Sequence, residues 1–179
     1  MNVRNYIKDT PVQEIMEMVV VNTYPYAFLT HRLMPLLKKR PGKKSAVITI
    51  SSSITVSPTA FDAIYACTKV FELYQMQSLN LENSEHKDKL DFLVINPMYV
   101  STNNARLPAG GNVETSETFV TSLLKSLGNV EVTYGTPKHN FLCYILELMN
   151  ALTSQYNWYS VISEKVISKL AARMWEKRN

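Results

Sequence analysis

The sequence predicts an α/β domain built on part of a doubly wound parallel sheet. Residues 46–50 and 90–95 form nearly continuous apolar runs, which are typical of strands buried on both faces of a parallel sheet. Helical patterns precede and follow both runs, as in successive βαβ units. Because functional groups in such sheets lie beyond the carboxyl ends of the strands, we expect a site close to residues 52 and 97.

The first helix is predicted over residues 10–37. Thr10 is suited to cap it, Pro11 suits the first helical position, and Gln13 completes a capping box. Pro25 falls inside this helix, where it cannot donate a hydrogen bond to the carbonyl four residues earlier. We therefore expect a bend that frees polar backbone beside Asn22.

The remaining elements follow from periodicity and from turn residues. We expect a second helix from about residue 62 to 81, and a flexible loop at 103–114 that contains Pro108, Gly110 and Gly111. Further elements are expected as a helix at 116–127 that stops at Gly128, a short strand at 130–134, an apolar helix at 141–152 and a basic amphipathic helix at 159–176.

The most informative side chains are those of Tyr65 and Lys69, which are four residues apart and share one face of the second helix. An ammonium beside a phenol favours the phenolate, so we expect Lys69 to lower the pKa of Tyr65 and make it usable in proton transfer near neutral pH. Ser52 stands thirteen positions upstream, at the end of the first strand. A strand-end serine followed by this helical pair suggests carbonyl reduction or alcohol oxidation.

These residues resemble the motifs of the short-chain dehydrogenase/reductases. The matching stretches are residues 47–53, 64–69 and 96–102, and the similarity extends from about Tyr6 to about Leu148. Within the superfamily, the chain is most similar to the C-terminal, catalytic half of 17β-hydroxysteroid dehydrogenases and very-long-chain 3-oxoacyl-CoA reductases. The resemblance implies a Rossmann-like fold and an NADP(H) cofactor, with either a 3-oxoacyl thioester or a steroid-like ketone as the lipid-like substrate.

The resemblance also implies a role for individual residues. Four would be catalytic and three more would border the cofactor beside Tyr65 and Lys69: catalytic Asn22, Ser52, Tyr65 and Lys69, and cofactor-binding Pro97, Val100 and Thr102. By itself, a serine triplet at a strand end is more often turn chemistry, and Ser53 is the alternative to Ser52. Asn22 can equally be a polar residue in a helix bend rather than the holder of a catalytic water.

The pyrophosphate cradle of this superfamily is not recognisable in the sequence. The five glycines, at positions 42, 110, 111, 128 and 135, cannot form Gly-x-x-x-Gly-x-Gly or Gly-x-Gly-x-x-Gly. At roughly 30 residues per βαβ unit, about 90 residues of the N-terminal dinucleotide-binding half have no counterpart before Asn22. The expected fold is therefore a Rossmann-like sheet that lacks this half.

Composition sets further bounds. The chain has 179 residues, 46% of them hydrophobic, and two cysteines, so we expect a globular domain in an intracellular, reducing compartment rather than a disulfide scaffold. The net charge of +4 comes largely from residues 38–44, where no aromatic residues are interleaved, so nucleic-acid binding is not expected. His31, His86 and His139 have no ligand spacing, and no metal site is expected.

The C-terminal part predicts a surface contact. We expect residues 1–150 to form a partial reductase domain and residues 151–179 a helical extension, whose basic amphipathic pattern suits a membrane surface or another protein. The sequence shows neither a signal peptide nor an obvious transmembrane span. By resemblance, the expected location is the endoplasmic reticulum membrane, with the mitochondrion second.

Two functional hypotheses from different classes remain open. The chain is either an enzyme whose cofactor site is completed by a partner protein, or a non-catalytic structural subunit of a larger assembly. In both cases we expect a partner chain on the exposed flank of the sheet, because an open apolar strand edge invites aggregation. A third alternative is an incomplete gene model.

Overall fold

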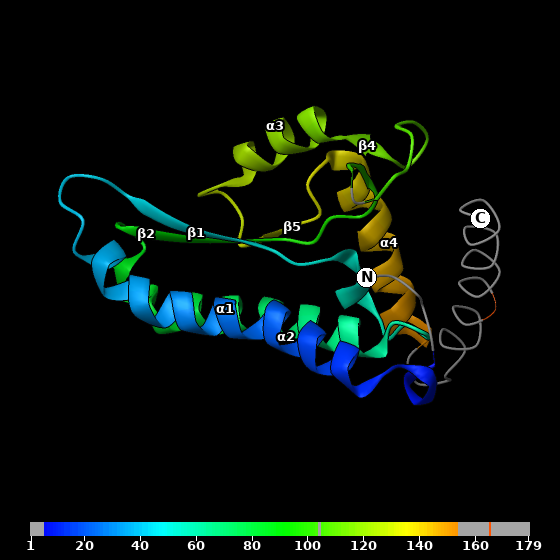
Figure 1. Cartoon of the computed structure of the whole chain (residues 1–179). Coiled ribbons are helices and arrows are strands. Elements are labelled where there is room, and N and C mark those ends of the chain that lie inside the picture. The colour runs from blue at the N-terminus through cyan, green and yellow to red at the C-terminus, as the bar shows by residue number, and fades with distance from the viewer. Residues whose placement is uncertain (1–5, 104, 154–164, 166–179) are drawn as a thin grey trace.

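The computed structural model describes residues 6–103, 105–153 and 165. A parallel three-stranded sheet lies between two helical layers, and its strand order is β1-β2-β5. Helices α1 (Val12–Lys38) and α2 (Ala63–Glu82) cover one face of the sheet, and α3 (Ser116–Ser126) lies over the other (Figure 1). The structure thus confirms the predicted α/β class and parallel sheet.

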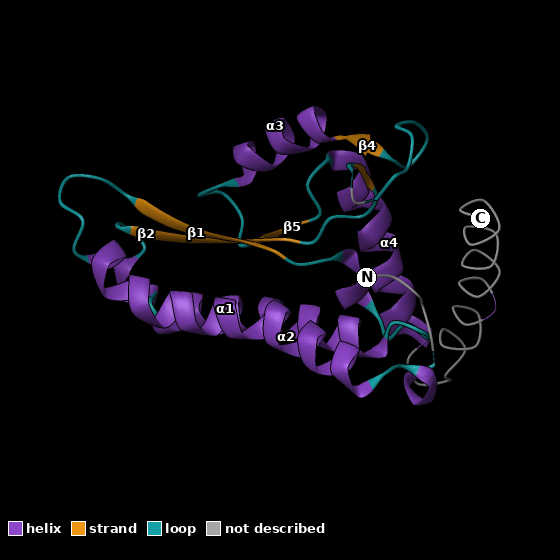
Figure 2. Cartoon of the chain, in the orientation of Figure 1, coloured by secondary structure: helices purple, strands orange, loops and turns teal. Residues whose placement is uncertain are grey.

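The strands are short and the helices long (Figure 2). The sheet contains β1 (Ser45–Ile50), β2 (Leu90–Ile95) and β5 (Val132–Thr133), while β3 (Val100–Ser101) and β4 (Glu114–Thr115) form a separate parallel pair. The last described helix is α4 (Pro137–Thr153), and the 3-10 turns are η1 (Ile7–Asp9), η2 (Ser53–Val56) and η3 (Ser84–His86).

The core lies around β2, the middle strand. On the side of α1 and α2, Phe92 and Val94 pack with Met76 and Met34. On the other side, side chains from β2 and α3 form a second cluster: Leu93, Ile95, Phe119 and Leu123. The strand is buried on both faces, as its apolar run predicts.

The same prediction is wrong for β1. Val47 and Thr49 face α1, but Ala46, Ile48 and Ile50 on the opposite face are exposed. The physical reason is position. Among the described residues, β1 is an edge strand paired with β2 alone. On the other face of the sheet, α3 packs against Leu93 and Ile95 of β2 and leaves β1 uncovered.

The predicted start of the first helix is also corrected. The Thr10 hydroxyl donates to the Tyr6 carbonyl at 3.1 Å instead of capping α1, and the Gln13 amide donates to the Glu17 carboxylate at 3.0 Å. Pro11 is the cap residue, and it makes no side-chain cap hydrogen bond. The capping box does not form because Thr10 is held by the turn that precedes the helix.

The remaining predicted elements are confirmed with small shifts of their boundaries. α2, α3 and β5 lie where the sequence places them, and Gly128 follows α3 with φ 77°. α4 begins at Pro137, four residues before its predicted start. The predicted helix at 159–176 falls outside the described residues except for Lys165. No helix in the described ranges has the length and apolarity needed to cross a membrane.

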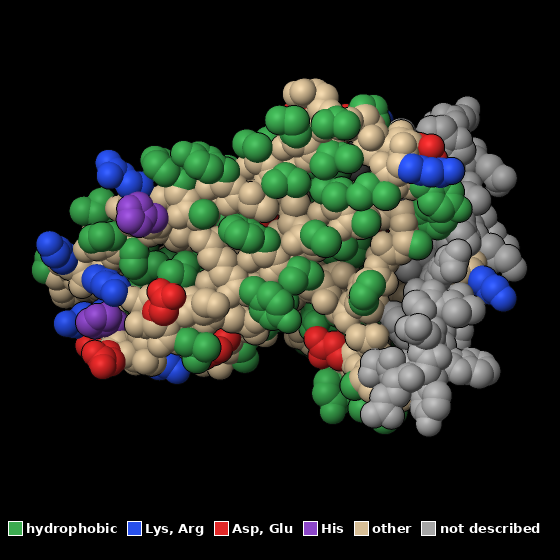
Figure 3. Space-filling model, turned by 90° about the horizontal axis from the view of Figure 1, so that it is seen from below, with side chains coloured by type: hydrophobic (Ala, Val, Ile, Leu, Met, Phe, Trp, Pro, Cys, Tyr) green, Lys and Arg blue, Asp and Glu red, His purple; other side chains and the backbone are tan. Residues whose placement is uncertain are grey.

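Apolar side chains are exposed on the two long helices. Figure 3 views the molecule from the side of these helices, and hydrophobic side chains are spread over the face. Large exposed members come from both helices: Val20, Tyr24, Phe28, Phe71 and Tyr74. So much exposed apolar area on two packed helices is typical of a surface that meets another macromolecule.

Candidate active site at the strand ends

Two backbone hydrogen bonds bring the ends of β1 and β2 together. The Ser51 amide donates to the Ile95 carbonyl at 2.7 Å, and the Ser53 amide donates to the Pro97 carbonyl at 3.0 Å. Ser52 lies between these two amides. The predicted neighbours Ser52 and Pro97 are therefore fixed at the same edge of the sheet, beyond the carboxyl ends of the strands.

Ser52 and Tyr65 are neighbours across this edge. The Ser52 side chain lowers the pKa of the Tyr65 phenol, and its hydroxyl accepts from the Ile54 amide at 3.3 Å. α2 supplies Tyr65 from its first turn, and the phenol is half-buried. The structure thus brings together the hydroxyl and the phenol that the sequence singles out.

The expected lowering of the Tyr65 pKa is wrong for this state of the chain. Burial raises the pKa of Tyr65 above its ordinary value, the Ser52 side chain lowers it, and the Glu72 and Asp62 carboxylates raise it further. Desolvation disfavours the charged phenolate, and the two carboxylates repel it. The phenol is therefore held in its protonated form at neutral pH.

Lys69 is close to Tyr65 but turned to other partners. Its ammonium lies 5.8 Å from the centre of the Tyr65 ring. It donates to the two Glu72 carboxylate oxygens at 2.9 and 3.0 Å and to the Ile50 carbonyl at 3.2 Å. The ammonium is therefore shared between β1 and the next turn of α2, which explains why it does not dominate the Tyr65 titration.

Glu72 is a residue that sequence reasoning missed. Its side chain is completely buried, although it lies on the same helix as the exposed Phe71 and Tyr74. Burial raises the pKa of Glu72, and Lys69 and then Ser51 lower it. The signal in the sequence was a lone carboxylate in the otherwise apolar run 70–73, three residues after Lys69 and hence on the same helix face.

Asn22 reaches α2 from the middle of α1. Its side-chain amide donates to the Thr68 hydroxyl at 3.1 Å, and that hydroxyl donates to the Tyr65 carbonyl at 2.8 Å. Asn22 is thus joined through Thr68 to the helix turn that carries the phenol and the ammonium. α1 continues through Pro25 in this region.

The three predicted cofactor neighbours follow β2. The Pro97 carbonyl is engaged by Ser53, and Val100 lies in β3, packed against the cluster around Leu93. The Thr102 hydroxyl accepts from the Ala105 amide at 3.0 Å, so it is occupied by its own turn. The three residues are therefore placed along one segment beside the site, with Val100 the most firmly anchored.

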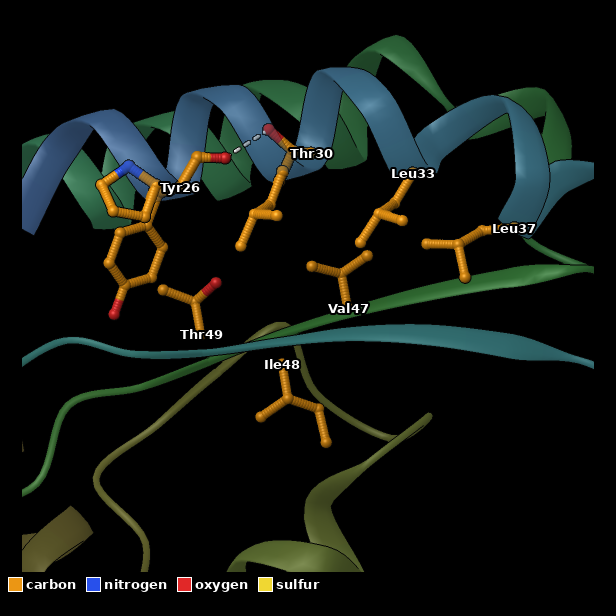
Figure 4. A pocket seen from close by; sticks show the side chains of 9 residues that line it. Tyr26, Thr30, Leu33, Leu37, Val47, Ile48 and Thr49 are labelled. Carbon is orange, nitrogen blue, oxygen red and sulfur yellow. Dashed lines mark hydrogen bonds between the residues drawn. The ribbon is translucent and has the colours of Figure 1, made fainter.

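A groove of about 250 Å³ lies between α1 and the outer part of β1. Figure 4 shows Leu33, Leu37 and Val47 pointing into it, whereas Ile48 points to the opposite side of the sheet. The lining is predominantly apolar and contains none of the predicted catalytic residues. The groove thus belongs to the open flank of the sheet and not to the catalytic edge.

Within the described part of the chain, no group of three or more His, Cys, Asp or Glu side chains is arranged to hold a metal ion. The chemistry of the site is that of a hydroxyl, a phenol and an ammonium–carboxylate pair. Such a set can donate and relay protons and can bind hydroxyl groups.

Comparison with known proteins gives a consistent picture. The family model for short chain dehydrogenases matches residues 1–108. The chain is 29% identical over 144 residues to the putative steroid dehydrogenase 2 of Caenorhabditis elegans, with 77% of this chain and 43% of the relative covered. It is 28% identical over 144 residues to the very-long-chain 3-oxoacyl-CoA reductase of Bos taurus, with 78% and 45% covered. The chain thus spans less than half the length of these relatives.

Solved structures show the same fold. A short chain dehydrogenase from Burkholderia cenocepacia in complex with NADP superposes with a TM-score of 0.70 at 16% identity, covering 87% of this chain and 64% of that one. A 7beta-hydroxysteroid dehydrogenase gives a TM-score of 0.67 at 22% identity, covering 80% and 56%. A carbonyl reductase from chicken fatty liver, bound to NADPH, gives 0.60 at 22% identity, covering 73% and 56%.

Proposed function

Because the chain belongs to the short-chain dehydrogenase family, we propose that it is the catalytic half of an NADP(H)-dependent carbonyl reductase or alcohol dehydrogenase. In this proposal a partner chain completes its cofactor site. The observation that carries the proposal is the placement of Ser52 beside Tyr65 at the strand ends, with the Lys69 ammonium 5.8 Å from the centre of the Tyr65 ring. A protonated phenol beside a second hydroxyl is the arrangement required to bind and protonate a carbonyl oxygen.

The residues present fit the nicotinamide end of a dinucleotide. The Tyr65 hydroxyl and the Lys69 ammonium are donors of the kind that bind ribose hydroxyls, and Val100 offers an apolar side chain on the adjoining segment. The sequence has no glycine-rich turn for the pyrophosphate. The proposal therefore assigns the nicotinamide and ribose to this chain, and the pyrophosphate to the partner chain.

In the proposed reaction the chain's own residues handle the proton. Bound NADPH would supply a hydride to the carbonyl carbon. The Ser52 hydroxyl would donate a hydrogen bond to the carbonyl oxygen, and Tyr65 would give that oxygen its proton. The raised pKa of Tyr65 suits this direction, because the phenol remains protonated until it is needed. Asn22, joined to the same helix turn through Thr68, would hold the water that returns the proton.

The substrate class is taken from the relatives. One bears the name of a very-long-chain 3-oxoacyl-CoA reductase and another that of a putative steroid dehydrogenase, so we propose a 3-oxoacyl-CoA or steroid-like ketone. A lipid-like substrate agrees with the basic amphipathic sequence at 159–176, which suits contact with a membrane surface, and by resemblance we propose that of the endoplasmic reticulum.

The partner would cover the outer flank of β1. Among the described residues no strand pairs with this edge, and Ile48 and Ile50 are exposed beside it. A strand added parallel to β1 would satisfy its outward backbone groups, and the groove between α1 and β1 would receive apolar side chains from it. The same partner would bring the missing pyrophosphate cradle to the catalytic edge.

The alternative is a non-catalytic structural subunit of a larger, membrane-bound assembly. One observation favours it: large apolar side chains, among them Tyr24, Phe28 and Tyr74, are exposed on α1 and α2, as is typical of a surface that contacts another macromolecule. In that case Ser52, Tyr65 and Lys69 would be retained without turnover.

Titration with NADPH separates the two candidates. Nucleotide fluorescence is followed with the purified chain and with the native assembly isolated through a tag on this chain. Saturable binding by the assembly alone supports the catalytic half. Binding by neither sample supports the structural subunit. Tight binding by the isolated chain would show that it needs no pyrophosphate cradle from a partner.

Replacing the phenol tests the chemistry directly. In an assembly that reduces a 3-oxoacyl-CoA with NADPH, Tyr65→Phe should lower the rate by about 10²–10⁴-fold, since positioned proton transfer is worth that much. The matched control is Tyr74→Phe, which removes an exposed hydroxyl from the same helix. Equal rates for the two variants would rule out Tyr65 as the proton donor.

A further inference from the structure

The Lys69 ammonium has its hydrogens fully engaged. An ammonium has three hydrogens, and three acceptors lie within reach: the two Glu72 oxygens at 2.9 and 3.0 Å and the Ile50 carbonyl at 3.2 Å. The Lys69 side chain is 12% exposed and that of Glu72 is fully buried. A ribose hydroxyl that approaches Lys69 must therefore displace one of these partners.

We propose that Glu72 is a positioning residue that holds the Lys69 ammonium against the end of β1. When a nucleotide binds, one of the hydrogen bonds from Lys69 to Glu72 must break so that the ammonium can donate to the nucleotide. The inference rests on the proposed role of Lys69. It adds that, before a nucleotide binds, the Lys69 ammonium is hydrogen-bonded to a carboxylate of the same helix. Nucleotide affinity is then set in part by the contact between Lys69 and Glu72.

The position of Glu72 makes its charge effective at the site. The groups that interact with the pair are Tyr65 from α2, Tyr26 from α1 and the Ser51 hydroxyl from the end of β1, and Asp62 at the start of α2 acts on Tyr65. After burial, the Glu72 carboxylate is a cause of the raised pKa of both Tyr65 and Tyr26. One buried carboxylate therefore acts on both the lysine and the phenol of the proposed site.

The arrangement also explains why a carboxylate is tolerated inside the domain. A buried carboxylate without a partner is strongly disfavoured, and Lys69 is the neighbour that lowers its pKa most. Ser51 assists, and its hydroxyl also donates to the Lys69 carbonyl at 2.8 Å. The pair is thus stabilised in the free chain, as the proposal requires of a lysine that binds the nucleotide only after one of these contacts breaks.

The first test measures the lysine without any turnover. Reductive methylation with formaldehyde and a borohydride is quantified at each lysine by mass spectrometry, with the exposed Lys125 as internal standard. In Glu72→Gln the side-chain amide keeps the size but not the charge, so Lys69 should react faster relative to Lys125 than in the wild type. Glu82→Gln, an exposed carboxylate on the same helix, should leave the ratio unchanged.

The second test measures the phenol. Tyrosines labelled with ¹³C at Cζ are titrated by NMR through the alkaline range, and the Tyr65 resonance is assigned by its loss in Tyr65→Phe. Glu72→Gln should move the Tyr65 titration to lower pH, whereas Glu82→Gln should not. Far-UV circular dichroism confirms that each variant is folded.

A misfolded Glu72→Gln does not end the test. Lys69→Gln and the double variant Lys69→Gln/Glu72→Gln both lack the ammonium and differ only in the carboxylate. The double variant should titrate at lower pH at Tyr65. The proposal is overturned if Tyr65 titrates identically in the two proteins compared, which are wild type and Glu72→Gln or, if that variant misfolds, Lys69→Gln and the double variant. An unchanged ratio of Lys69 to Lys125 methylation in a folded Glu72→Gln also overturns it. Because neither measurement uses nucleotide or substrate, they can fail while the proposed reaction stands, and the reverse also holds.

Discussion

β1 and β2 are hydrogen-bonded neighbours with similar apolar sequences, yet their environments are opposite. In β2, Leu93 is 0% exposed and lies between two strands and two helical layers, whereas in β1 Ile48 is 42% exposed. The difference shows that an apolar run records how much burial a strand requires, not which elements provide it. In β1 that requirement is met on the face toward α1 and remains unmet on the other face and along the outer edge.

Amide hydrogen exchange should show the largest contrast between the two strands. The Ser45 amide donates to the Lys89 carbonyl just before β2, and the Ser51 amide donates to Ile95 at its end, so by alternation the amide of Ile48 faces the open edge. The Val94 amide donates to the Glu131 carbonyl at 2.8 Å inside the sheet. Exchange at Val94 should be slower than at Ile48 by about 10³-fold or more, relative to unstructured peptide rates.

The same measurement on the native assembly sharpens the comparison. A partner strand on β1 should slow exchange at Ile48 and leave Val94 nearly unchanged. If Ile48 is already protected in the isolated chain, the edge is covered by something within the chain, and the comparison between the strands fails.

Truncation of one side chain in each strand should separate their contributions to stability. Leu93→Ala leaves a cavity in the core and should lower the free energy of unfolding by about 2–5 kcal/mol. Ile48→Ala removes an exposed side chain and should change it by about 0.5 kcal/mol or less. Urea unfolding followed by circular dichroism gives both values, and similar losses would contradict the assignment of β1 as a half-covered edge.

A charge on the outer face of β1 should act on assembly and not on the isolated chain. In Ile48→Lys the ammonium stays in water while the chain is alone, so the urea midpoint should move little. Desolvation of that charge against a partner should weaken association by about tenfold or more. Sedimentation of the tagged assembly tests this, with Lys44→Ala, a change at a partly exposed residue, as control. Unaltered association would place the partner elsewhere.

The smallest effect concerns pH and the strand beside β2. Burial raises the pKa of Tyr134, and its hydrogen bond to Glu147 raises it further. The folded chain therefore keeps a proton that the unfolded chain loses above its ordinary pKa of about 10, so stability falls as pH rises past that value. At roughly half a pH unit above that ordinary pKa, each phenol of this kind lowers the free energy of unfolding by about 1 kcal/mol. Tyr134→Phe should reduce this alkaline loss, measured as urea midpoints at neutral and alkaline pH.

Much of the fold could be predicted from the sequence because its local signals agree with one another. The apolar runs, the helical periodicity and Gly128 predicted β1, β2, α2 and α3 within one or two residues. The capping of α1 was mispredicted because Thr10 had two acceptable uses, and the preceding turn took it. Such competition between local hydrogen bonds is decided by the neighbouring backbone, which a propensity does not contain.

The candidate site was predictable in its members but not in its contacts. Spacing and resemblance predicted Ser52 and Tyr65 at one edge, where the structure places the two side chains as neighbours. Spacing did not predict that Lys69 would turn to Glu72 and Ile50, nor that burial would raise the pKa of Tyr65. Those outcomes depend on which groups lose water together, and desolvation is a property of the packed molecule.

The sequence by itself determined the parallel α/β architecture, the family and the residue types of the candidate site, because periodicity and motif spacing are local properties of a chain. Only the tertiary structure decided that β1 is an open edge and that the Lys69 ammonium is hydrogen-bonded to a buried carboxylate. Burial depends on contacts between segments far apart in sequence, and the Lys69–Glu72 pair, although local to one helix, loses water only when those segments pack around it. These free energies therefore exist only once the chain has packed.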